Sequence, residues 1–249
     1  MNKPIQIIED NFQVAWAKMI KHLEEENLFN VQIHVNGNTT INEKYQTLLT
    51  DFAKENNLIP PKQVAHTIFP YHFYKNNISR ADLYKVYWRY FSYTRKLEHS
   101  GWGTYFERMI RFQGNKQEPF DQLGSIIDNL NNRKVVRGHC NVIVIPYSSD
   151  QNKTMGQPCL NYISVQVEKD INNQKIINLL AIYRNHDFYQ RAYGNYLGLI
   201  KLLHYIANET NSKIGKLTCF SSHAFLEGKN KKQLISIANT IIGENAVQA

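Results

Sequence analysis

One short segment, YRNHDFYQRAYGNYLGL at residues 183–199, places Arg184, Asp187 and Asn195 directly before an apolar helical pattern. An ordinary turn rarely needs all three side chains, whereas a site for a small anionic ligand could use each of them. A guanidinium binds phosphate through two parallel hydrogen bonds, a planar geometry that lysine lacks. An asparagine amide offers one donor and one acceptor to the edge of a base. The segment therefore predicts a ligand site and raises the question of a reacting group.

Cys159, which follows Pro158, is the candidate for that reacting group. A thiol in water titrates near about 8.5, so it is mostly protonated at neutral pH and a poor nucleophile. A guanidinium beside the sulfur would favour the thiolate, and Arg184 is the residue expected to supply it. We therefore expect Cys159 to be a nucleophile that Arg184 keeps ionised. An inert buried thiol is the alternative.

The elements that must position these residues can be read from the hydrophobic pattern. Amphipathic or apolar helical spacing covers residues 12–27, 46–57, 120–132 and 195–210. Strand patterns cover 33–40 (the edge of a strand followed by a turn), 134–146, 161–170, 176–184 and 216–226. The turn DINNQK between 161–170 and 176–184 predicts a hairpin. Strand pairs mixed with helices predict one α+β domain over residues 1–249, while residues 60–115 give no clear assignment.

Composition narrows the class of protein. The 249 residues are 43% hydrophobic, enough for a sizeable core, and contain no run of about 18 apolar residues that would span a membrane. Three scattered cysteines, no zinc-type spacing and no signal-like start predict a cytoplasmic protein without a metal. The net charge of +8 favours anionic partners, but it is spread along the chain. The one dense run, at 228–233, is interpreted as a solvated loop, so a nucleic-acid partner is not favoured.

Four blocks in order resemble thymidylate synthase and its relatives, the pyrimidine-nucleotide hydroxymethylases. The resemblance runs from about residue 120 to 227. The blocks are NRKVVRGHCNV (132–142), QPCLNYISVQ (157–166), LLAIYRNHDFYQRAYGNYLGLIKLLHYIA (179–207) and TCFSSHAF (218–225). The resemblance implies a single thymidylate-synthase-like domain, a mixed β-sheet packed with helices, and a homodimer formed sheet to sheet.

The resemblance also implies roles for individual residues. Cys159 would be the nucleophile, assisted by Arg184 and by Asp187, which orders the turn before the helix. Asn195 would bind the base; an amide suits uracil, whereas cytosine calls for a carboxylate. The remaining substrate ligands would be His223 at the sugar, and Arg133 with Lys134 at the phosphate, Arg133 reaching into the pocket of the partner subunit. A structural role is the alternative for Asp187, Arg133 and His223.

The implied reaction is one-carbon transfer to C5 of a pyrimidine nucleotide, with 5,10-methylenetetrahydrofolate as the donor. Addition of Cys159 to C6 would make C5 carbanion-like and able to attack the one-carbon unit. Methylation and hydroxymethylation both stay open at this point. So do a nucleotide-binding or regulatory protein that does not turn its ligand over, and a cysteine enzyme that acts on a non-nucleotide anion.

Several positions depart from the family pattern. The segment HVNGNTT (34–40) lacks the arginine of the family's phosphate loop, and Phe225 replaces a tyrosine that would bind the sugar. Leu160 replaces the histidine that usually follows the nucleophile. The segment QVAHTIFPYHFYKNN (63–77) contains no carboxylate for proton transfer, and a rough alignment places His72 there. A lost general acid or base typically costs 10²–10⁴-fold in rate, which is why the silent alternative is kept.

Overall fold

The computed structural model describes residues 5–75, 78–97, 103–113, 118–132 and 140–246. Its strands are β1 (Gln6–Glu9), β2 (Leu28–Asn36), β3 (Cys140–Val144), β4 (Leu160–Lys169), β5 (Lys175–Tyr183), β6 (His186–Asp187) and β7 (Lys213–Phe225). Its helices are α1 (Phe12–His22), α2 (Glu43–Glu55), α3 (Pro61–Ile68), α4 (Arg80–Leu97), α5 (Tyr105–Ile110), α6 (Gln122–Asn131), α7 (Ala192–Glu209) and α8 (Lys231–Ala246). A short 3-10 turn, η1 (Ser148–Asp150), precedes β4.

The strands form one mixed sheet in the order β1-β2-β7-β5-β4-β3. Parallel pairs (β1 with β2, β5 with β7) alternate with antiparallel ones (β2 with β7, β4 with β5, β3 with β4). The expected α+β class and the hairpin of 161–170 with 176–184 are therefore confirmed. The end of a strand and the turn expected at 33–40 are the end of β2 and the turn after it; the strand itself begins earlier, at Leu28, and pairs with β1 and β7 on either side.

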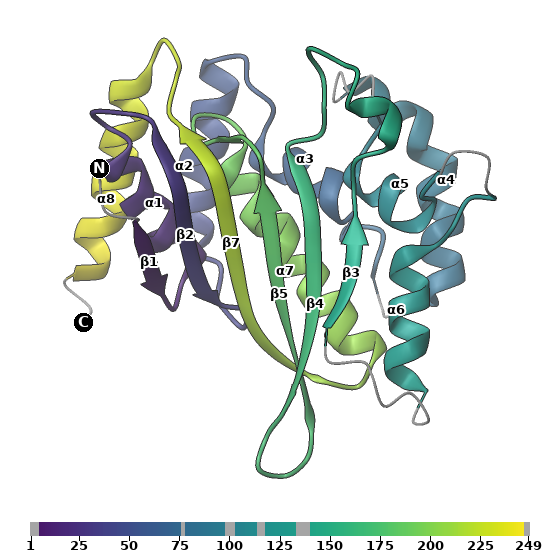
Figure 1. Ribbon diagram of the computed structural model, residues 1–249. Helices are drawn as coiled ribbons and strands as arrows, with labels where there is room; N and C mark the ends of the chain where they lie inside the picture. The colour runs from purple at the N-terminus through teal and green to yellow at the C-terminus, as the bar shows by residue number, and fades with distance from the viewer. Residues whose placement is uncertain (1–4, 76–77, 98–102, 114–117, 133–139, 247–249) are drawn as a thin grey trace.

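Helices cover one face of the sheet, and the core lies between the two layers (Figure 1). The alternation in β5 sets which side chains enter that core: Ile177, Leu179, Ala181 and Tyr183 are fully buried, while their neighbours along the strand point the other way. The opposite face of the sheet carries no helix of the described chain (Figure 1). On that open face, Val142 and Val144 of β3 are each 42% exposed.

A break between β5 and β6 interrupts their pairing with β7 at the end of the strands where the site lies. β5 follows β7 as far as the Tyr183–Ser221 pair, and β6 resumes the same parallel pairing at His186 opposite Ala224. Arg184 and Asn185, between them, step out of the ladder. Interruptions of this kind redirect side chains and are frequent beside functional sites.

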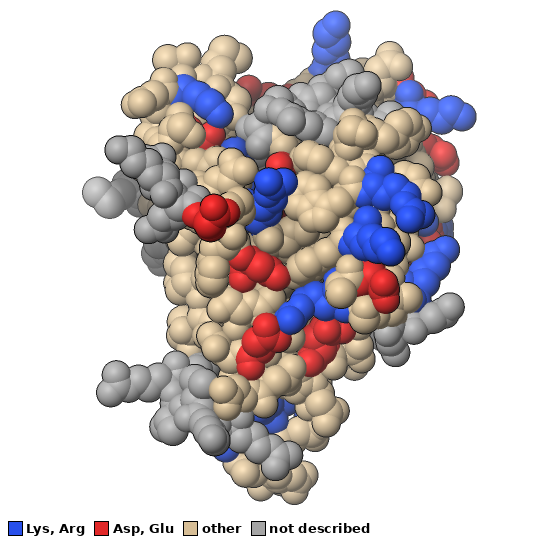
Figure 2. Space-filling view, turned by 90° about the vertical axis from the view of Figure 1, so that its right-hand side faces the viewer, with Lys and Arg blue, Asp and Glu red and all other residues tan. Residues whose placement is uncertain are grey.

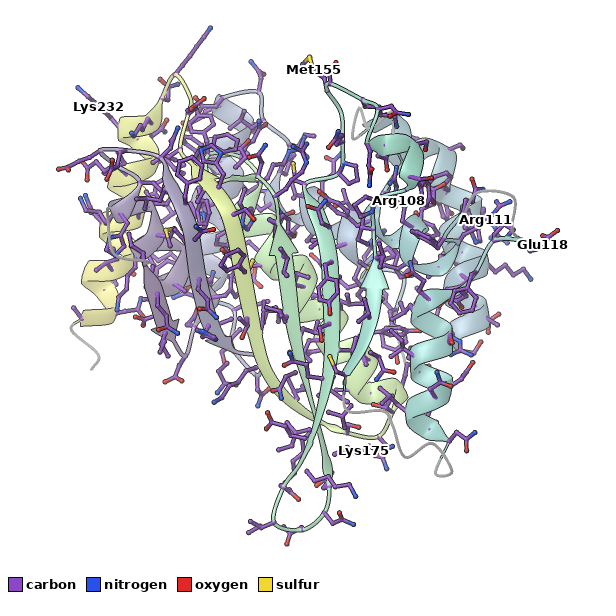
Figure 3. All side chains as sticks on the ribbon, viewed as in Figure 1. Arg108, Arg111, Glu118, Met155, Lys175 and Lys232 are labelled. Atoms are coloured by element: carbon purple, nitrogen blue, oxygen red, sulfur yellow. The ribbon has the colours of Figure 1, made fainter. Side chains whose placement is uncertain are left out.

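The loop ahead of β4 is held by a buried ion pair. Arg108 of α5 and Asp150 of η1 are both about 2% exposed and form a salt bridge, and Arg108 also donates to the Ile145 carbonyl at 3.1 Å. Burial alone would raise the pKa of Asp150, but hydrogen bonds from Arg108, Lys153 and a backbone N–H hold it well below its usual range. In Figure 3, Met155 marks the tip of this loop and Arg108 lies below it. The loop is thus anchored close to Cys159.

The surface shows no continuous basic patch on the side drawn in Figure 2, where basic and acidic side chains of the described residues are interspersed. One such pair is Arg80 of α4 with Asp128 of α6, whose side chains meet at 2.8 Å. No helix in the described part of the chain is long and apolar enough to cross a membrane.

Several elements were absent from the sequence-based expectations, among them β1 and α8. The strand β1 is only four residues long, and α8 begins at Lys231, inside the basic run interpreted as a loop. Residues 60–115, which gave no assignment, contain α3, α4 and α5. The strand expected over 134–146 is seen as Cys140–Val144, since residues 133–139 lie outside the described ranges.

Helix α7, which carries Asn195, packs closely on α3 because two glycines line the contact. A Cβ added at Gly194 would lie 2.6 Å from the Pro61 carbonyl oxygen, and one added at Gly198 would lie 2.7 Å from that of Ala65. Neither backbone oxygen can give way without a shift of α3. These glycines thus fix the distance between α7 and its neighbour.

Gly198→Ala should therefore lower the free energy of unfolding by about 1–3 kcal/mol, the usual cost of overpacking. Gly243→Ala is the matched control, because a Cβ at this exposed position of α8 meets nothing within 4 Å. It should stabilise the protein by roughly 0.5–1 kcal/mol through helix propensity. Urea unfolding followed by circular dichroism measures both, and equal effects of the two substitutions would refute the close packing.

Candidate active site

Cys159 lies at the start of β4, between Pro158 and Leu160. Its side chain is half-buried, in contrast to the exposed Cys140 and the buried Cys219. The backbone N–H of Arg184 donates to the Cys159 carbonyl at 2.9 Å, one step beyond the Leu160–Tyr183 pair of β4 and β5. Strand pairing therefore brings the cysteine and the arginine side by side.

The guanidinium of Arg184 binds the segment that leads into the cysteine. Its Nε donates to the Pro158 carbonyl and its Nη2 to the Gln157 carbonyl, both at 3.2 Å. Charge-assisted hydrogen bonds of this kind are roughly twice as strong as neutral ones. Arg184 thus fixes the path of the chain into Cys159. Since a guanidinium carries five N–H donors, others stay available to a ligand.

Asn185 connects Arg184 to His223. When its amide nitrogen faces His223 Nδ1, at 3.1 Å, its oxygen accepts from Arg184 Nη1 at 3.2 Å. The half-buried His223 ring lies between two phenylalanines, 4.9 Å from the Phe29 ring and 5.5 Å from the Phe225 ring, measured between centroids. The histidine is thereby tied to the arginine through one amide, while Phe225 presents an apolar ring without a hydroxyl.

Asp187 orders the turn between β6 and α7. Its Oδ1 accepts from the backbone N–H groups of Tyr189 at 2.9 Å and Gln190 at 3.2 Å. Its backbone carbonyl accepts from the N–H of Arg191 at 3.1 Å. Burial raises the pKa of the carboxyl, and these hydrogen bonds oppose that effect. Asp187 therefore serves the turn through its own carboxylate, while its charge stays close to the cysteine.

Asn195, in the first turn of α7, is buried and contacts a second histidine that sequence interpretation missed. His186 Nε2 lies 3.3 Å from Asn195 Nδ2, and His186 Nδ1 lies 2.8 Å from Ser221 Oγ. The His186 ring also stacks on Tyr183, with 4.0 Å between centroids and 3° between planes. The sequence around His186 is typical of a turn. Its burial follows from β6, which resumes the pairing with β7, and the sequence does not predict this strand.

The electrostatics of Cys159 correct the expectation that Arg184 keeps the thiol ionised. Burial raises the pKa of Cys159 and exceeds the opposing effect of the Arg184 guanidinium. The Asp187 carboxylate raises this pKa further, and Arg191 lowers it. At neutral pH the sulfur is therefore a thiol, which must lose its proton when it attacks.

Arg191 and Tyr105 are the other residues near the cysteine that sequence interpretation missed. Arg191 precedes α7, is half-buried, and forms no hydrogen bond or ion pair through its side chain with any residue that the structure describes. The Tyr105 hydroxyl accepts from the Leu160 N–H at 3.4 Å. Arg191 stands four residues before Asn195, a spacing that becomes a shared helix face only once the start of α7 is known.

Three further residues were considered from the sequence: Arg133, Lys134 and His72. Arg133 and Lys134 lie outside the described residues. His72 packs elsewhere, with its ring 3.9 Å from the rings of both His66 and Phe73. A cavity of about 420 Å³ lies between α7, the start of β7 and the residues after α3, and none of the predicted site residues lines it.

Groups that could hold a metal or a donor were also sought. Among the described residues, no group of three or more His, Cys, Asp or Glu side chains is arranged to hold a metal ion. The guanidinium of Arg191, which forms no ion pair with a described residue, could bind an anionic group close enough to influence Cys159.

Comparison with known proteins gives a distant similarity. The chain is 28% identical over 123 residues to a protein of Methanococcoides burtonii named "Putative thymidylate synthase". The match covers 49% of this chain and 52% of that protein, so the chain spans about half the length of its relative. No model of a known protein family matches the chain. The relative's name and the four sequence blocks point to the same thymidylate-synthase-like class.

The charges around Cys159 make its reactivity testable. In a Cys140→Ser background, alkylation by iodoacetamide followed against pH should have its midpoint above that of an exposed thiol, about 8.5. Arg191→Gln should move the midpoint up because it removes a positive charge, and Asp187→Asn should move it down because it removes a negative one. A wild-type midpoint below that of the urea-unfolded protein would contradict the dominance of burial.

Proposed function

We propose that the protein transfers a one-carbon unit to C5 of a uracil-type pyrimidine nucleotide, with Cys159 as its nucleophile. The main support for the proposal is that Arg184 donates hydrogen bonds to the carbonyls of Gln157 and Pro158, directly before the cysteine. The same arginine contacts Asn185, which reaches His223. A thiol, a guanidinium and a histidine are thus linked at one end of strands β4, β5 and β7. The buried amide of Asn195 is connected to Ser221 of β7 through His186.

Each residue has a distinct role in this proposal. Cys159 attacks the ring, Arg184 contacts the phosphate with its remaining N–H donors, and His223 contacts the sugar. Asn195 binds the O4 and N3–H edge of the base, since its amide provides the complementary donor and acceptor. Asp187 holds the turn that presents α7 to the base. Arg133 and Lys134 complete the phosphate site.

The chemistry can be followed bond by bond. The Cys159 sulfur forms a bond to C6, and the electron pair of the C5–C6 double bond moves toward C5 and O4. C5 would then form a bond to the one-carbon unit and lose its proton. The bond between that carbon and a nitrogen of the donor would break, and hydride or water would take the place of the donor on the transferred carbon. Finally the sulfur–C6 bond breaks, the double bond returns and the thiolate leaves. Covalent catalysis of this kind replaces one difficult substitution by easier steps.

The raised pKa of Cys159 gives the reaction a pH dependence. Only the thiolate adds to the ring, and burial keeps the thiol protonated at neutral pH. The rate of addition should therefore rise with pH until the pKa of Cys159 is reached. A bound nucleotide that excludes water without adding positive charge would raise that pKa further, so Arg184 and Arg191 are needed to oppose the effect.

The donor proposed is 5,10-methylenetetrahydrofolate, bound as a second substrate. When bound, it would supply a carbon at the oxidation level of formaldehyde. Arg191 is the residue of this chain that would hold a carboxylate of the donor. Methyl and hydroxymethyl products differ in whether hydride or water reaches the transferred carbon.

The partner proposed is a second copy of the chain, packed against the open face of the sheet. Val142 and Val144 point out of this face, and Tyr162 of β4 lies directly opposite Val144. An uncovered row of apolar side chains is typical of a protein interface. Sedimentation at micromolar concentration should show a dimer, and a monomer would refute this arrangement.

A second candidate is a protein that binds the nucleotide without reacting. It is favoured by the raised pKa of Cys159 and by Leu160, which stands where the family has a histidine. On this reading Arg184, Asn195 and His223 bind the ligand, and the thiol lines the pocket.

Intact-mass spectrometry separates the two candidates. After incubation with 5-fluorodeoxyuridylate and 5,10-methylenetetrahydrofolate, the protein should gain the mass of a covalent adduct. Cys159→Ala should abolish the adduct, and Cys140→Ser, which changes the exposed thiol, should retain it. Reversible nucleotide binding without any adduct would favour the silent protein, and an adduct that survives Cys159→Ala would place the chemistry elsewhere.

A further inference from the structure

The buried histidine behind the proposed base-binding amide invites an explanation. His186 is fully buried, Asn195 is 4% exposed and Ser221 is 1% exposed. The three side chains form a chain of contacts from α7 through β6 to β7, with 3.3 Å between Asn195 and His186 and 2.8 Å between His186 and Ser221. A phenylalanine of similar size would fill this space without any polar group to satisfy.

The surroundings keep the histidine neutral. Its ring is stacked on Tyr183, and the rings of Phe188 and Tyr196 lie 4.9 and 5.4 Å away between centroids. Burial lowers the pKa of His186 to about 3, and no charged group of the described chain opposes that effect. A neutral imidazole has one N–H donor and one bare acceptor nitrogen, so one of its two neighbours must accept a hydrogen bond and the other must donate one.

The side-chain orientations in the structure correspond to one of the two neutral forms. Asn195 turns its Nδ2, a donor, toward His186 Nε2, so Nε2 must be the bare acceptor. The proton then lies on Nδ1 and is donated to Ser221 Oγ. In this orientation the donation runs from Asn195 to His186, and from His186 to Ser221.

We propose that His186 is a positioning residue, which locks the Asn195 amide in one orientation and thereby selects a uracil edge over a cytosine edge. This inference rests on the proposed function. Rotating the amide by 180° would set its oxygen against the bare Nε2, and the hydrogen bond would be kept only if the ring proton also moved from Nδ1 to Nε2 and the Ser221 hydroxyl turned to donate. Uracil and cytosine present opposite donor and acceptor patterns at positions 3 and 4, so a locked amide matches one of them.

The fixed orientation of the Asn195 amide should therefore set the ratio of the affinities for deoxyuridylate and deoxycytidylate. A lost or mismatched buried hydrogen bond typically changes affinity by between about fivefold and 150-fold. Without the lock, the amide could rotate to suit either base, and discrimination between deoxyuridylate and deoxycytidylate should fall toward unity. Overall affinity should change less than the ratio, because the phosphate and sugar contacts are untouched.

The first test reads the histidine directly, without any ligand. In protein labelled with ¹⁵N-histidine, long-range proton–nitrogen spectra distinguish a protonated Nδ1 from a protonated Nε2. The signal that disappears in His186→Phe should show a protonated Nδ1 and a bare Nε2, unchanged between pH 5 and pH 9. A protonated Nε2, or a charged ring, would overturn the inference.

The second test measures the ratio of the affinities for deoxyuridylate and deoxycytidylate. Ser221→Ala removes the acceptor of the Nδ1 proton and leaves the ring stacking intact, so the ratio of the two nucleotide affinities should fall at least about fivefold. Ser222→Ala is the matched control on the other face of β7, where the ratio should stay that of the wild type. An unchanged ratio in Ser221→Ala would overturn the role of His186. If the wild type binds neither nucleotide, the proposed function fails and the selecting role with it, while the ring's protonation is still read by the first test.

Discussion

The hydrogen bonds between Arg184 and the carbonyls of Gln157 and Pro158 are the interaction on which the rest of the site depends. They cross from the end of β5 to the residues just before β4, and they add to the backbone pairing that already brings Cys159 beside Arg184. Because Arg184 lies in the break between β5 and β6, its side chain can turn out of the sheet while the strands on either side stay paired. Through Asn185 the same guanidinium reaches His223. One side chain thus sets the positions of the thiol and of the proposed sugar ligand.

The site also shows a competition between burial and charge. A nucleophilic sulfur that attacks a flat ring benefits from a dry pocket, yet removal of water favours the protonated thiol. Two guanidiniums act against this effect at Cys159, and the Asp187 carboxylate acts with it. The proposed nucleophile is therefore a thiol that is protonated in the free protein, and in the proposed reaction the step that removes its proton becomes central to the rate. Burial acts in the same sense on His186: it disfavours the charged form, and so it lowers the pKa of the histidine and keeps the ring neutral.

Much of the second half of the fold could be predicted from the sequence, because strands 161–170 and 176–184 and helix 195–210 have clear hydrophobic periods. Two elements near the ends of the chain were harder to predict: β1 is too short for a period, and α8 begins within lysines that suit a loop equally well. For the site, residue types and spacing singled out Arg184, Asp187 and Asn195, which lie just after β5, in β6 and in the first turn of α7. They could not indicate the burial of Cys159, which depends on packing between distant elements. Nor could they reveal His186 or Arg191, whose importance follows from where β6 resumes and where α7 starts.

The central claim is that the Cys159 sulfur adds to C6 of a pyrimidine nucleotide, and release of tritium from C5 of labelled deoxyuridylate tests it most directly. Addition at C6 loosens the bond between C5 and its hydrogen, so that the label can pass to water when C5 is substituted. Our account predicts release in the presence of 5,10-methylenetetrahydrofolate, at a rate that rises with pH and falls to background in Cys159→Ser. Tight binding of the nucleotide without release, or equal release by Cys159→Ser, would contradict it.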